Sequence, residues 1–567
     1  MKFAKYLMLV FVFCACTGST KAQTVAFLGG GSSALFQELG AATQSIPGIS
    51  CLWSFGSTTT PGGTPYIAAH DGRTGVNDDE NGKFFVAWGP GTGSCASPAG
   101  SWSIYAYIQL DSVVGDRCYF ENDGSGSSGC TLILQNTGIA GTSQITTTPD
   151  KPLATALPTA VSNALLGAPH FFVAGTDIRP EDAKFATQRA FTPCNQYMPR
   201  QYFNQDSYYL FGLGYGTGNI GTAIQGNASY GGGNFGVYNF NVTGNDPISG
   251  AAVPAYSVST IGAQPIVVAV APANTGNGNI AAMTDITAAT LSLFYEGVLG
   301  RTSDLLGPTG GAEAFTTLVR EPLSGTYNTF EYSIPQSTQF HAGQDFGNCT
   351  GGGAVLSNPM ALNNGNGVFG TASQRVRVIG TGNMTKFLQQ ATTPTLGYFF
   401  WSAGNAKNLT NVKYLKVNGV DPLLDTATAY NGVLPNSGAT FATDPGLAHV
   451  GFAGLNAGDY PIWSALRLVG PPGNAGVAAM ITALATLDSS QKDYIPPSSM
   501  NIWHSHFFLN GQSAIGANGT TVGSSTLCSG GIAEGGGDAG GSTLLIINNA
   551  HFCSDYGNTG GLVNKTF

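Results

Sequence analysis

Residues 24–42, TVAFLGGGSSALFQELGAA, decide the fold class of this chain. The apolar run Thr24–Leu28 predicts a strand, and the apolar spacing of Leu35–Ala42 predicts a helix. Between them lies a turn of glycines and hydroxyl residues, Gly29–Ala34. A strand, a glycine-rich turn and a helix in this order are typical of the start of an α/β fold. The dinucleotide fingerprint Gly-x-Gly-x-x-Gly is absent, so a nucleotide site is not favoured.

Strand and helix patterns continue to alternate along the chain. Such alternation predicts a mainly parallel sheet, whose ligands bind beyond the carboxyl ends of its strands. Several of these ends carry a small hydroxyl, a carboxylate or an arginine. The predicted strands are 170–177, 264–272, 396–401 and 460–469, and the predicted helices are 286–297, 383–390 and 476–487, with a further helix ending at 163–167.

Other segments have a β-rich or loop-rich pattern. Residues 51–119 alternate in polarity, and we interpret them as a β-rich insertion on a first lobe, stapled through Cys95. The segment 195–256 is rich in Gly, Asn, Tyr and Phe and predicts hairpins and loops. Beyond residue 491 we expect a tail of short strands. Strands inside the insertion are predicted at 83–88, 102–108 and 118–120.

The composition limits the class of protein. Charged residues make up 9%, glycines number 81, and aromatic residues make up 11%. A disordered chain has few aromatic residues and many charges, so this chain is expected to fold. The net charge of −9 argues against nucleic acid as a partner, because nucleic-acid binders carry basic patches.

The N-terminus has the layout of a secretory signal peptide. Residues 1–22 hold lysines, an apolar run and a small-x-small site at Thr20–Ala22, so the mature chain is expected to begin near Gln23. Lipid attachment at Cys16 is the alternative, but Phe13 is a poor match to such signals. No later segment is apolar enough to span a membrane. The sequence predicts a periplasmic or extracellular protein.

The cysteines agree with export. Eight remain after the leader, and an even number in an oxidising compartment favours disulfides over metal or catalytic thiols. No Cys-x-x-Cys pair occurs, which weakens a zinc or redox interpretation. Spacing does not fix the connectivity, although Cys118 with Cys130 and Cys528 with Cys553 are plausible short-range bridges.

The string LVREPLSGTY, residues 318–327, has the chemistry of an oxyanion site. Arg320 offers a planar fork of donors, and Ser324 and Thr326 add hydroxyl donors. Gly325 allows backbone N–H groups to approach a ligand. A helix that begins near Ser324 directs its partial positive charge to the same place. The alternatives are an ordinary helix start after a turn, and a surface ion pair for Arg320.

The order of these segments resembles the phosphate-binding family of periplasmic solute-binding proteins, which serve phosphate ABC importers. Arg320 with Ser324-Gly325-Thr326 reproduces the family's spacing. Strands and helices resembling the family's run from about Phe27 to Leu487, interrupted by long insertions. The resemblance implies an α/β, two-lobed type 2 periplasmic-binding-protein fold, here with β-rich insertions and a β-rich C-terminal extension.

The resemblance also implies further ligand residues. Asp177, after the strand 170–177, corresponds to the aspartate that accepts a hydrogen bond from protonated phosphate; its alternative is a helix cap. Ser33 and Ala34 correspond to the first glycine-rich loop, although Ala34 replaces a bulkier residue. The family's second loop has no secure counterpart, and Ser127 or Ser128 could supply it.

We therefore expect a signal peptide at 1–22, lobe 1 at 23–262, lobe 2 at 263–459, and a return to lobe 1 with an extension at 460–567. The expected function is capture of inorganic phosphate or a related oxyanion for an ABC importer, by a monomer that is not an enzyme and needs no metal or cofactor.

Two other functions remain open. A secreted phosphatase-like enzyme on the same scaffold needs a metal or nucleophile, for which the histidines His504, His506 and His551 are the candidates. An exposed face of a plain β-strand is the simpler interpretation of these histidines. A cell-surface adhesin or polysaccharide-binding protein is suggested by the loops rich in Gly, Asn and Tyr.

Overall fold

A computed structural model gives the fold of most of the chain between residues 23 and 496, together with short strands beyond it. The residues that the structure describes are 23–54, 58–59, 65–66, 84–121, 157–168, 171–180, 182–183, 240–247, 250–271, 278–306, 315–320, 323–335, 344, 360–362, 374–378, 380–407, 409–426, 429–439, 441–457, 459–487, 492–496, 504–506, 514–515, 521–522 and 564–566. The leader at 1–22, the pair Ser127 and Ser128, and His551 lie outside these residues.

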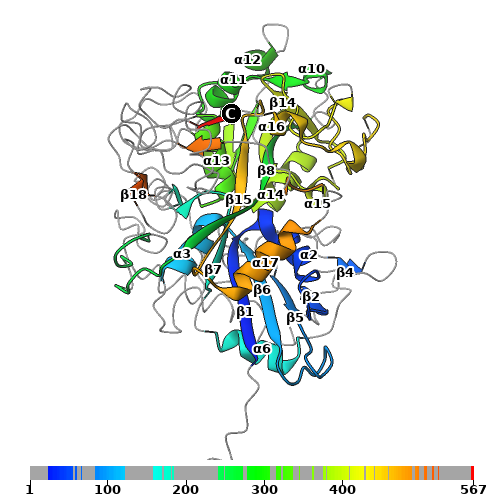
Figure 1. Ribbon diagram of the computed structural model, residues 1–567. Helices are drawn as coiled ribbons and strands as arrows, with labels where there is room; N and C mark the ends of the chain where they lie inside the picture. The colour runs from blue at the N-terminus through cyan, green and yellow to red at the C-terminus, as the bar shows by residue number, and fades with distance from the viewer. Residues whose placement is uncertain are drawn as a thin grey trace, which may run out of the picture.

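Lobe 1 is built on a mixed sheet whose central strands are parallel (Figure 1). Strand β1 (Thr24–Ser32) lies between β6 (Ser103–Leu110) and β7 (Val173–Thr176) and is parallel to both. The antiparallel strands β5 (Phe84–Trp88) and β2 (Cys51–Ser54) extend the sheet beyond β6. The carboxyl ends of β1, β6 and β7 therefore meet at one edge.

Helices cover both faces of the lobe 1 sheet. Helices α2 (Phe36–Thr43) and α17 (Ala475–Ala485) pack on one face, in a core that includes Tyr107 of β6. Helices α3 (Ser112–Glu121) and α6 (Thr159–Leu166) pack on the other, in a core that includes Ile108. Successive residues of a strand face opposite sides, so β6 is buried on both faces.

Lobe 2 continues the same sheet. Its central strands are β13 (Thr395–Phe400) and β10 (Thr316–Val319), followed by the parallel strands β12 (Gln374–Arg377) and β11 (Met360–Leu362). Its core contains side chains of α11 (Ala288–Tyr295), α13 (Gly325–Ser333) and α14 (Gly380–Gln390). Strands β14 (Lys413–Val417) and β9 (Asp285–Ile286) form a side branch of the sheet.

Two strands join the lobes. Strand β8 (Ser257–Val270) pairs through Pro265 with β15 (Trp463–Gly470) and from Ile266 onward with β13. Strand β15 also pairs with β7 of lobe 1. Both run along the centre of the molecule in Figure 1, between the lower and upper lobes. The α/β class and the two-lobed arrangement expected from the sequence are thus present. The sheet is mixed and not mainly parallel, because β8, β15, β5 and β2 pair antiparallel. The expected boundary at residue 262 falls inside β8.

Smaller elements complete the described part of the chain. No helix in it is long and apolar enough to cross a membrane. The remaining elements are η1 (Ser33–Leu35), β3 (Thr58–Thr59), β4 (Pro65–Tyr66), α10 (Gly278–Ala282), α12 (Thr302–Leu306), α15 (Ala403–Ala406), η7 (Leu447–His449), α16 (Ala453–Asn456), β16 (His504–His506), β17 (Ala514–Ile515), β18 (Thr521–Val522) and β19 (Asn564–Thr566).

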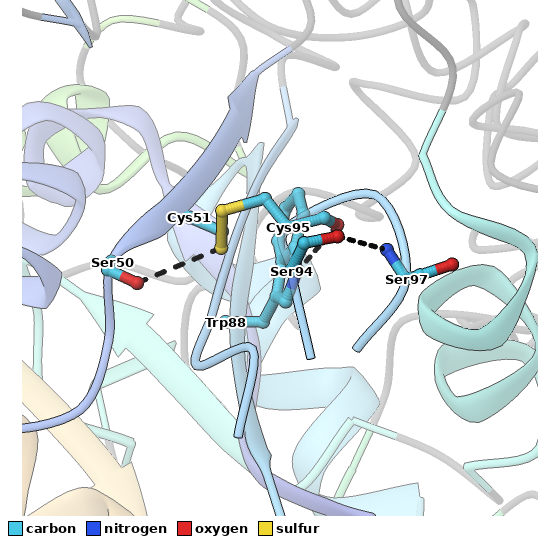
Figure 2. The surroundings of a disulfide bond; sticks show 6 residues. All are labelled: Ser50, Cys51, Trp88, Ser94, Cys95 and Ser97. Atoms are coloured by element: carbon cyan, nitrogen blue, oxygen red, sulfur yellow. Dashed lines mark hydrogen bonds between the residues drawn. A yellow bond between two sulfur atoms is a disulfide. The ribbon is translucent and has the colours of Figure 1, made fainter. Parts of the chain in front are cut away.

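A disulfide holds the outer edge of the lobe 1 sheet. Cys51, the first residue of β2, is bonded to Cys95 in the loop between β5 and β6 (Figure 2). The indole N–H of Trp88 donates to the carbonyl oxygen of Cys95 at 3.2 Å. Cys118 is also disulfide-bonded. Its suggested partner Cys130, and the suggested pair Cys528 and Cys553, lie outside the described residues.

Two expectations about lobe 1 are wrong. The segment 118–120, expected as a strand because of its aromatic residues, belongs to helix α3. Every residue from Ser112 to Phe120 is buried, so no apolar period of 3.6 is visible in the sequence. The segment 51–119 is not an insertion either, since β6 pairs with β1 from Thr24 to Ser32 at the centre of the sheet.

Candidate functional site

Polar residues follow the carboxyl ends of the three central strands of lobe 1. Ser32 ends β1 and is followed by Ser33; Asp111 and Ser112 follow β6; and Asp177 follows β7. All five are buried. Neighbouring parallel strands end at the same edge, so these side chains gather on the side of lobe 1 that faces lobe 2.

Asp177 and Ser112 form a hydrogen-bonded unit at this edge. The Ser112 hydroxyl donates to Oδ1 of Asp177, and the Asp177 backbone N–H donates to the Ser112 oxygen at 3.4 Å. Burial raises the pKa of the Asp177 carboxyl above its ordinary value. The Ser112 hydrogen bond, the Asp177 backbone N–H, and the charges of Arg320 and Arg467 act in the opposite direction. Asp177 is therefore an acceptor that its surroundings supply with donors and positive charge.

Gly325 brings lobe 2 against this unit. It is the first residue of α13, and a Cβ atom at this position would overlap the Asp177 carboxyl group and the Ser112 hydroxyl. Only glycine fits between the helix and the carboxylate. A backbone hydrogen bond of 3.3 Å from Val113 to the Leu323 carbonyl also crosses between the lobes here. The N-terminus of α13 is thus in contact with lobe 1.

Ser324 caps α13. Its hydroxyl accepts from the Tyr327 backbone N–H at 3.4 Å, and its carbonyl accepts from the Asn328 side chain at 2.8 Å. Thr326 is buried in the first turn. The partial positive charge of a helix N-terminus and its N–H groups favour an anion at this position. The helix start predicted from the sequence at Ser324 is confirmed.

Arg320 lies directly after β10 and is 1% exposed. Its Nη1 donates to the Thr381 hydroxyl, in the first turn of α14, at 2.8 Å. Its Nη2 lies 3.8 Å from Oδ1 of Asp111 in lobe 1. The surface ion pair considered from the sequence is therefore not what the structure has, because the guanidinium is buried between the two lobes.

An aromatic and amide network supports the backbone of Arg320. The Arg320 N–H donates to the Tyr398 hydroxyl at 3.4 Å, and that hydroxyl donates to Oε1 of Gln344 at 2.6 Å. The Tyr398 ring stacks on Phe330 of α13 with centroids 4.0 Å apart. The position of Arg320 is thus tied to α13 as well as to β10.

Ser33 and Ala34 lie at the end of β1, in the short helix η1. The Ser32 hydroxyl accepts from the Ala34 N–H at 3.2 Å, and the Ser32 carbonyl accepts from the Tyr107 hydroxyl at 2.7 Å. Gly31 pairs with Gly175, two residues before Asp177. This register places Ser33 and Ala34 at the same carboxyl-end edge of the lobe 1 sheet as Asp177. Their assignment as ligand residues rests on this position alone.

Three polar residues of the site were missed by the sequence interpretation. Asp111 and Ser112 follow a central strand that had been taken for part of an insertion, so the second loop was sought at Ser127 or Ser128. Asp177 was assigned through the family resemblance, but it is also a polar residue directly after a buried strand, and Leu110-Asp111-Ser112 has the same pattern. Thr381 had no local signal, because its importance depends on its contact with Arg320.

The described residues contain no group of three or more His, Cys, Asp and Glu side chains that could hold a metal ion. The described residues of the site instead bring together donors, one helix N-terminus, buried arginines and buried carboxylates. Such a set can bind an anion that still carries a proton, because the carboxylates accept from that proton while the arginines oppose the anion's charge.

No protein-family model matches the sequence, and no curated protein matches it. Similar solved structures exist. A phosphate-binding protein from Stenotrophomonas maltophilia is 14% identical, with 70% of this chain and 84% of that chain covered and a TM-score of 0.31. The high affinity periplasmic phosphate-binding protein PfluDING, bound with phosphate at pH 8.5, is 12% identical, with 83% and 90% covered and a TM-score of 0.31.

An ABC-type phosphate transport receptor from Vibrio cholerae is 15% identical, with 45% of this chain and 78% of that chain covered and a TM-score of 0.26. At these identities and TM-scores the similarity carries no argument about the ligand of this chain. That argument rests on the geometry of the strand ends and of α13.

Proposed function

We propose that this protein is an exported solute-binding protein that captures inorganic phosphate, or a related partly protonated oxyanion, between its lobes. One observation carries the proposal: Asp177 of lobe 1 lies against Gly325 at the N-terminus of α13 in lobe 2. Arg320 is buried at the same junction. A carboxylate, a helix N-terminus and a guanidinium thus converge where two lobes meet.

Each group has a distinct task in this proposal. Arg320 opposes the charge of the anion and can grip two of its oxygens. Ser33, Ser324, Thr326 and the N–H groups of α13, including that of Gly325, donate hydrogen bonds. Ser112, from the second loop, donates its hydroxyl proton to Asp177 and so positions that carboxylate, while Ala34 offers its backbone to the anion. Ser127 and Ser128, which the sequence suggested for the second loop, remain secondary candidates as ligand residues.

Asp177 selects among oxyanions. As a carboxylate it accepts a hydrogen bond from phosphate or arsenate, which keep a proton at neutral pH. Sulfate has no proton to donate, so its oxygen and the carboxylate repel each other. The hydrogen bond from Ser112 keeps one carboxylate oxygen of Asp177 in a fixed position.

Export and transport belong to the same proposal. We keep three predictions from the sequence: a signal peptide at 1–22, a monomeric mature chain and an ABC importer as partner. We also keep the predicted domain bounds, which are 23–262 for lobe 1, 263–459 for lobe 2 and 460–567 for the return to lobe 1 with the extension. The Cys51–Cys95 disulfide supports an oxidising compartment. N-terminal sequencing of secreted protein should show a mature chain that begins near Gln23, and a lipid-modified Cys16 would contradict this.

Isothermal titration with phosphate, arsenate, sulfate and methylphosphonate tests the function. We expect phosphate to bind with a Kd of about 1 μM or below, which is about −8 kcal/mol. Arg320→Ala should weaken binding by about a hundredfold or more, because a buried charge partner is lost. Arg301→Ala is the matched control, since Arg301 is an exposed arginine of the same lobe.

Asp177→Asn should weaken phosphate binding and reduce the discrimination against sulfate. Unchanged phosphate affinity in Arg320→Ala would refute the site, and a wild-type protein that binds none of the four anions would refute the function. Metal analysis and a phosphatase assay on the same preparation test the enzyme alternative, which requires a bound metal or turnover. Glycan binding by that preparation would favour an adhesin.

A further inference from the structure

Arg467 is a second buried arginine near the proposed site, and the sequence interpretation gave it no role. It lies on β15, is fully buried, and pairs with Thr176, the last residue of β7. Because Asp177 follows Thr176 directly, Arg467 is next to the chain segment that carries the carboxylate. Its Nη1 donates to the Ala465 carbonyl at 2.8 Å, which fixes part of the guanidinium.

The strand alternation places Arg467 on the face of the sheet that carries the site. Val469, two residues further along β15, packs in the same core as Val113 of α3 and Leu323 before α13. Leu466 and Leu468 pack in the core on the opposite face. Since every second residue of a strand shares a face, Arg467 lies on the side of α3 and Leu323.

The register of β15 with β8 shifts beside Arg467. Leu466 pairs with Gly262 and Arg467 with Thr260, so the extra residue, Ile261, lies on β8. Strand β15 stays regular against β7, so the pairing of Arg467 with Thr176 sets its position relative to Asp177.

Several charged and titratable groups surround Asp177. Arg320 approaches from the end of β10, Arg467 from β15, Tyr107 from β6, and Ser112 from the start of α3; the first turn of α13 brings no acidic side chain. Arg320 and Arg467 both lower the pKa of Asp177 against the effect of burial. Two further buried acids lie nearby on the same segment, Asp111 and Asp116.

Ligand binding changes this balance. A bound anion opposes the charge of Arg320 and adds negative charge beside Asp177, so both effects favour protonation of the carboxyl group. Arg467 is fully buried on β15 and keeps its charge and its influence on Asp177 when the anion is present. A protonated Asp177 becomes a donor, and a donor no longer discriminates against an anion without a proton.

We propose that Arg467 is a specificity-determining residue that acts through Asp177, by keeping its carboxyl group ionised while the anion occupies the cleft. This inference rests on the proposed function. Arg467 acts through the charge that it places near Asp177, and it does not itself need to contact the ligand. As long as Asp177 stays ionised, the site should prefer an oxyanion that carries a proton and can donate it in a hydrogen bond to the Asp177 carboxylate.

The decisive experiment compares the Kd values for phosphate and sulfate in wild type, Arg467→Met and Arg467→Lys between about pH 5 and about pH 9. Loss of the positive charge should reduce the ratio of sulfate Kd to phosphate Kd about tenfold or more, since each pKa unit is a factor of ten in protonation. Sulfate binding by Arg467→Met should increase as the pH falls. Arg467→Lys should retain the wild-type ratio.

Two variants separate this effect from a general loss of charge or stability. Arg117→Met removes an equally buried arginine of lobe 1 that is paired with Asp246, and should leave the ratio unchanged. In Asp177→Asn the ratio should be reduced and the Kd for sulfate should not change with pH, and adding Arg467→Met should lower the ratio no further. Equal weakening of phosphate and sulfate in Arg467→Met would overturn the inference.

A measurement on the wild-type protein does not depend on whether Arg467→Met folds. The carboxyl carbon of Asp177, followed by NMR in the phosphate-loaded protein, should show an ionised group across the same pH range. A protonated Asp177 in the loaded protein would overturn the inference while phosphate binding itself stands. Failure of the proposed function is distinguished by the wild-type titration, where no anion would bind at all.

Discussion

The lobes meet at two places that contain buried carboxyl groups, and the two places differ in what faces those groups. At the proposed anion site, the Asp177 carboxyl is accompanied by Arg320 and Arg467. At the second place, Glu38 of α2 lies near Asp493, whose Oδ1 accepts from the Ala403 N–H of α15 at 2.5 Å.

The second place favours neutral carboxyl groups. Burial, followed by the charge of Asp493, raises the pKa of Glu38 well above its ordinary value, against a hydrogen bond from the Glu38 backbone N–H. Burial also raises the pKa of Asp493, against the hydrogen bond from Ala403. Burial raises the pKa at both places. At the proposed anion site, the hydrogen bond from Ser112 and the charges of Arg320 and Arg467 oppose this effect, whereas at Glu38 the charge of Asp493 adds to it. The two places thus differ in charge partners and not in burial.

The largest expected effect comes from Gly325→Ala, which breaks the contact at the anion site. The added methyl group overlaps the Asp177 carboxyl, so the lobes cannot approach to the same distance. We expect phosphate affinity to fall by more than about a hundredfold, which is about 3 kcal/mol. Isothermal titration measures it, with Gly167→Ala as the control, because a Cβ there comes no closer than 3.1 Å to its neighbours. Wild-type affinity in Gly325→Ala would show that ligand binding does not need this contact.

A smaller effect is expected at the second place from Glu38→Gln. An acid whose pKa is raised in the folded protein binds more protons there than in the unfolded chain, so the free energy of unfolding falls as the pH rises above the ordinary value of 4.5. Glutamine cannot titrate. The variant should therefore equal wild type near pH 4.5 and exceed it by about 2 kcal/mol well above the raised pKa.

Urea unfolding at several pH values measures this difference. Glu296→Gln is a suitable control, since Glu296 is only half-buried and accepts a hydrogen bond from Ser292 at 3.1 Å. A Glu38→Gln variant that is less stable than wild type at neutral pH would mean that Glu38 is ionised and paired, contrary to the comparison of the two places.

The smallest effect is expected from Asp111→Asn, which tests how a second carboxylate of the proposed anion site affects Arg320. Asp111 competes for Arg320 across a distance of 3.8 Å and repels an incoming anion. Removing its charge should raise phosphate affinity by about two- to fivefold, which is about 1 kcal/mol or less. The increase should be similar for phosphate and sulfate in parallel titrations. A loss of affinity would instead assign Asp111 to holding Arg320 in place.

Much of this molecule could be predicted from short segments. Strand β1 with its following helix, α13 after Ser324, and β13 each follow from local patterns that the structure confirms. The string from Arg320 to Thr326 could be recognised as anion chemistry because its donors are close in sequence. Asp177 was assigned because the segment 174–177 resembles the family's strand-end turn, and the structure places it directly after β7.

What failed has a common physical cause. Helix α3 is buried on all sides, so its sequence lacks the 3.6-residue period that separates a helix from a strand. Strand β6 was predicted as a strand, but its place beside β1 at the centre of the sheet depends on pairing between distant segments. Because both were assigned to an insertion, the second loop was sought in a glycine-rich run and not at Asp111 and Ser112. Thr381 and Glu38 could not be found locally, since their surroundings come from distant parts of the chain.

The sequence by itself determined the α/β class, the helix start at Ser324 and the residue types of the proposed anion site, because these depend on neighbours within a few positions. Only the tertiary structure decided that Gly325 closes on Asp177, that Ser112 holds its carboxylate, and that Arg467 lies one strand away. Strand register and the meeting of two lobes set these contacts, and both depend on burial between segments that are far apart in the chain.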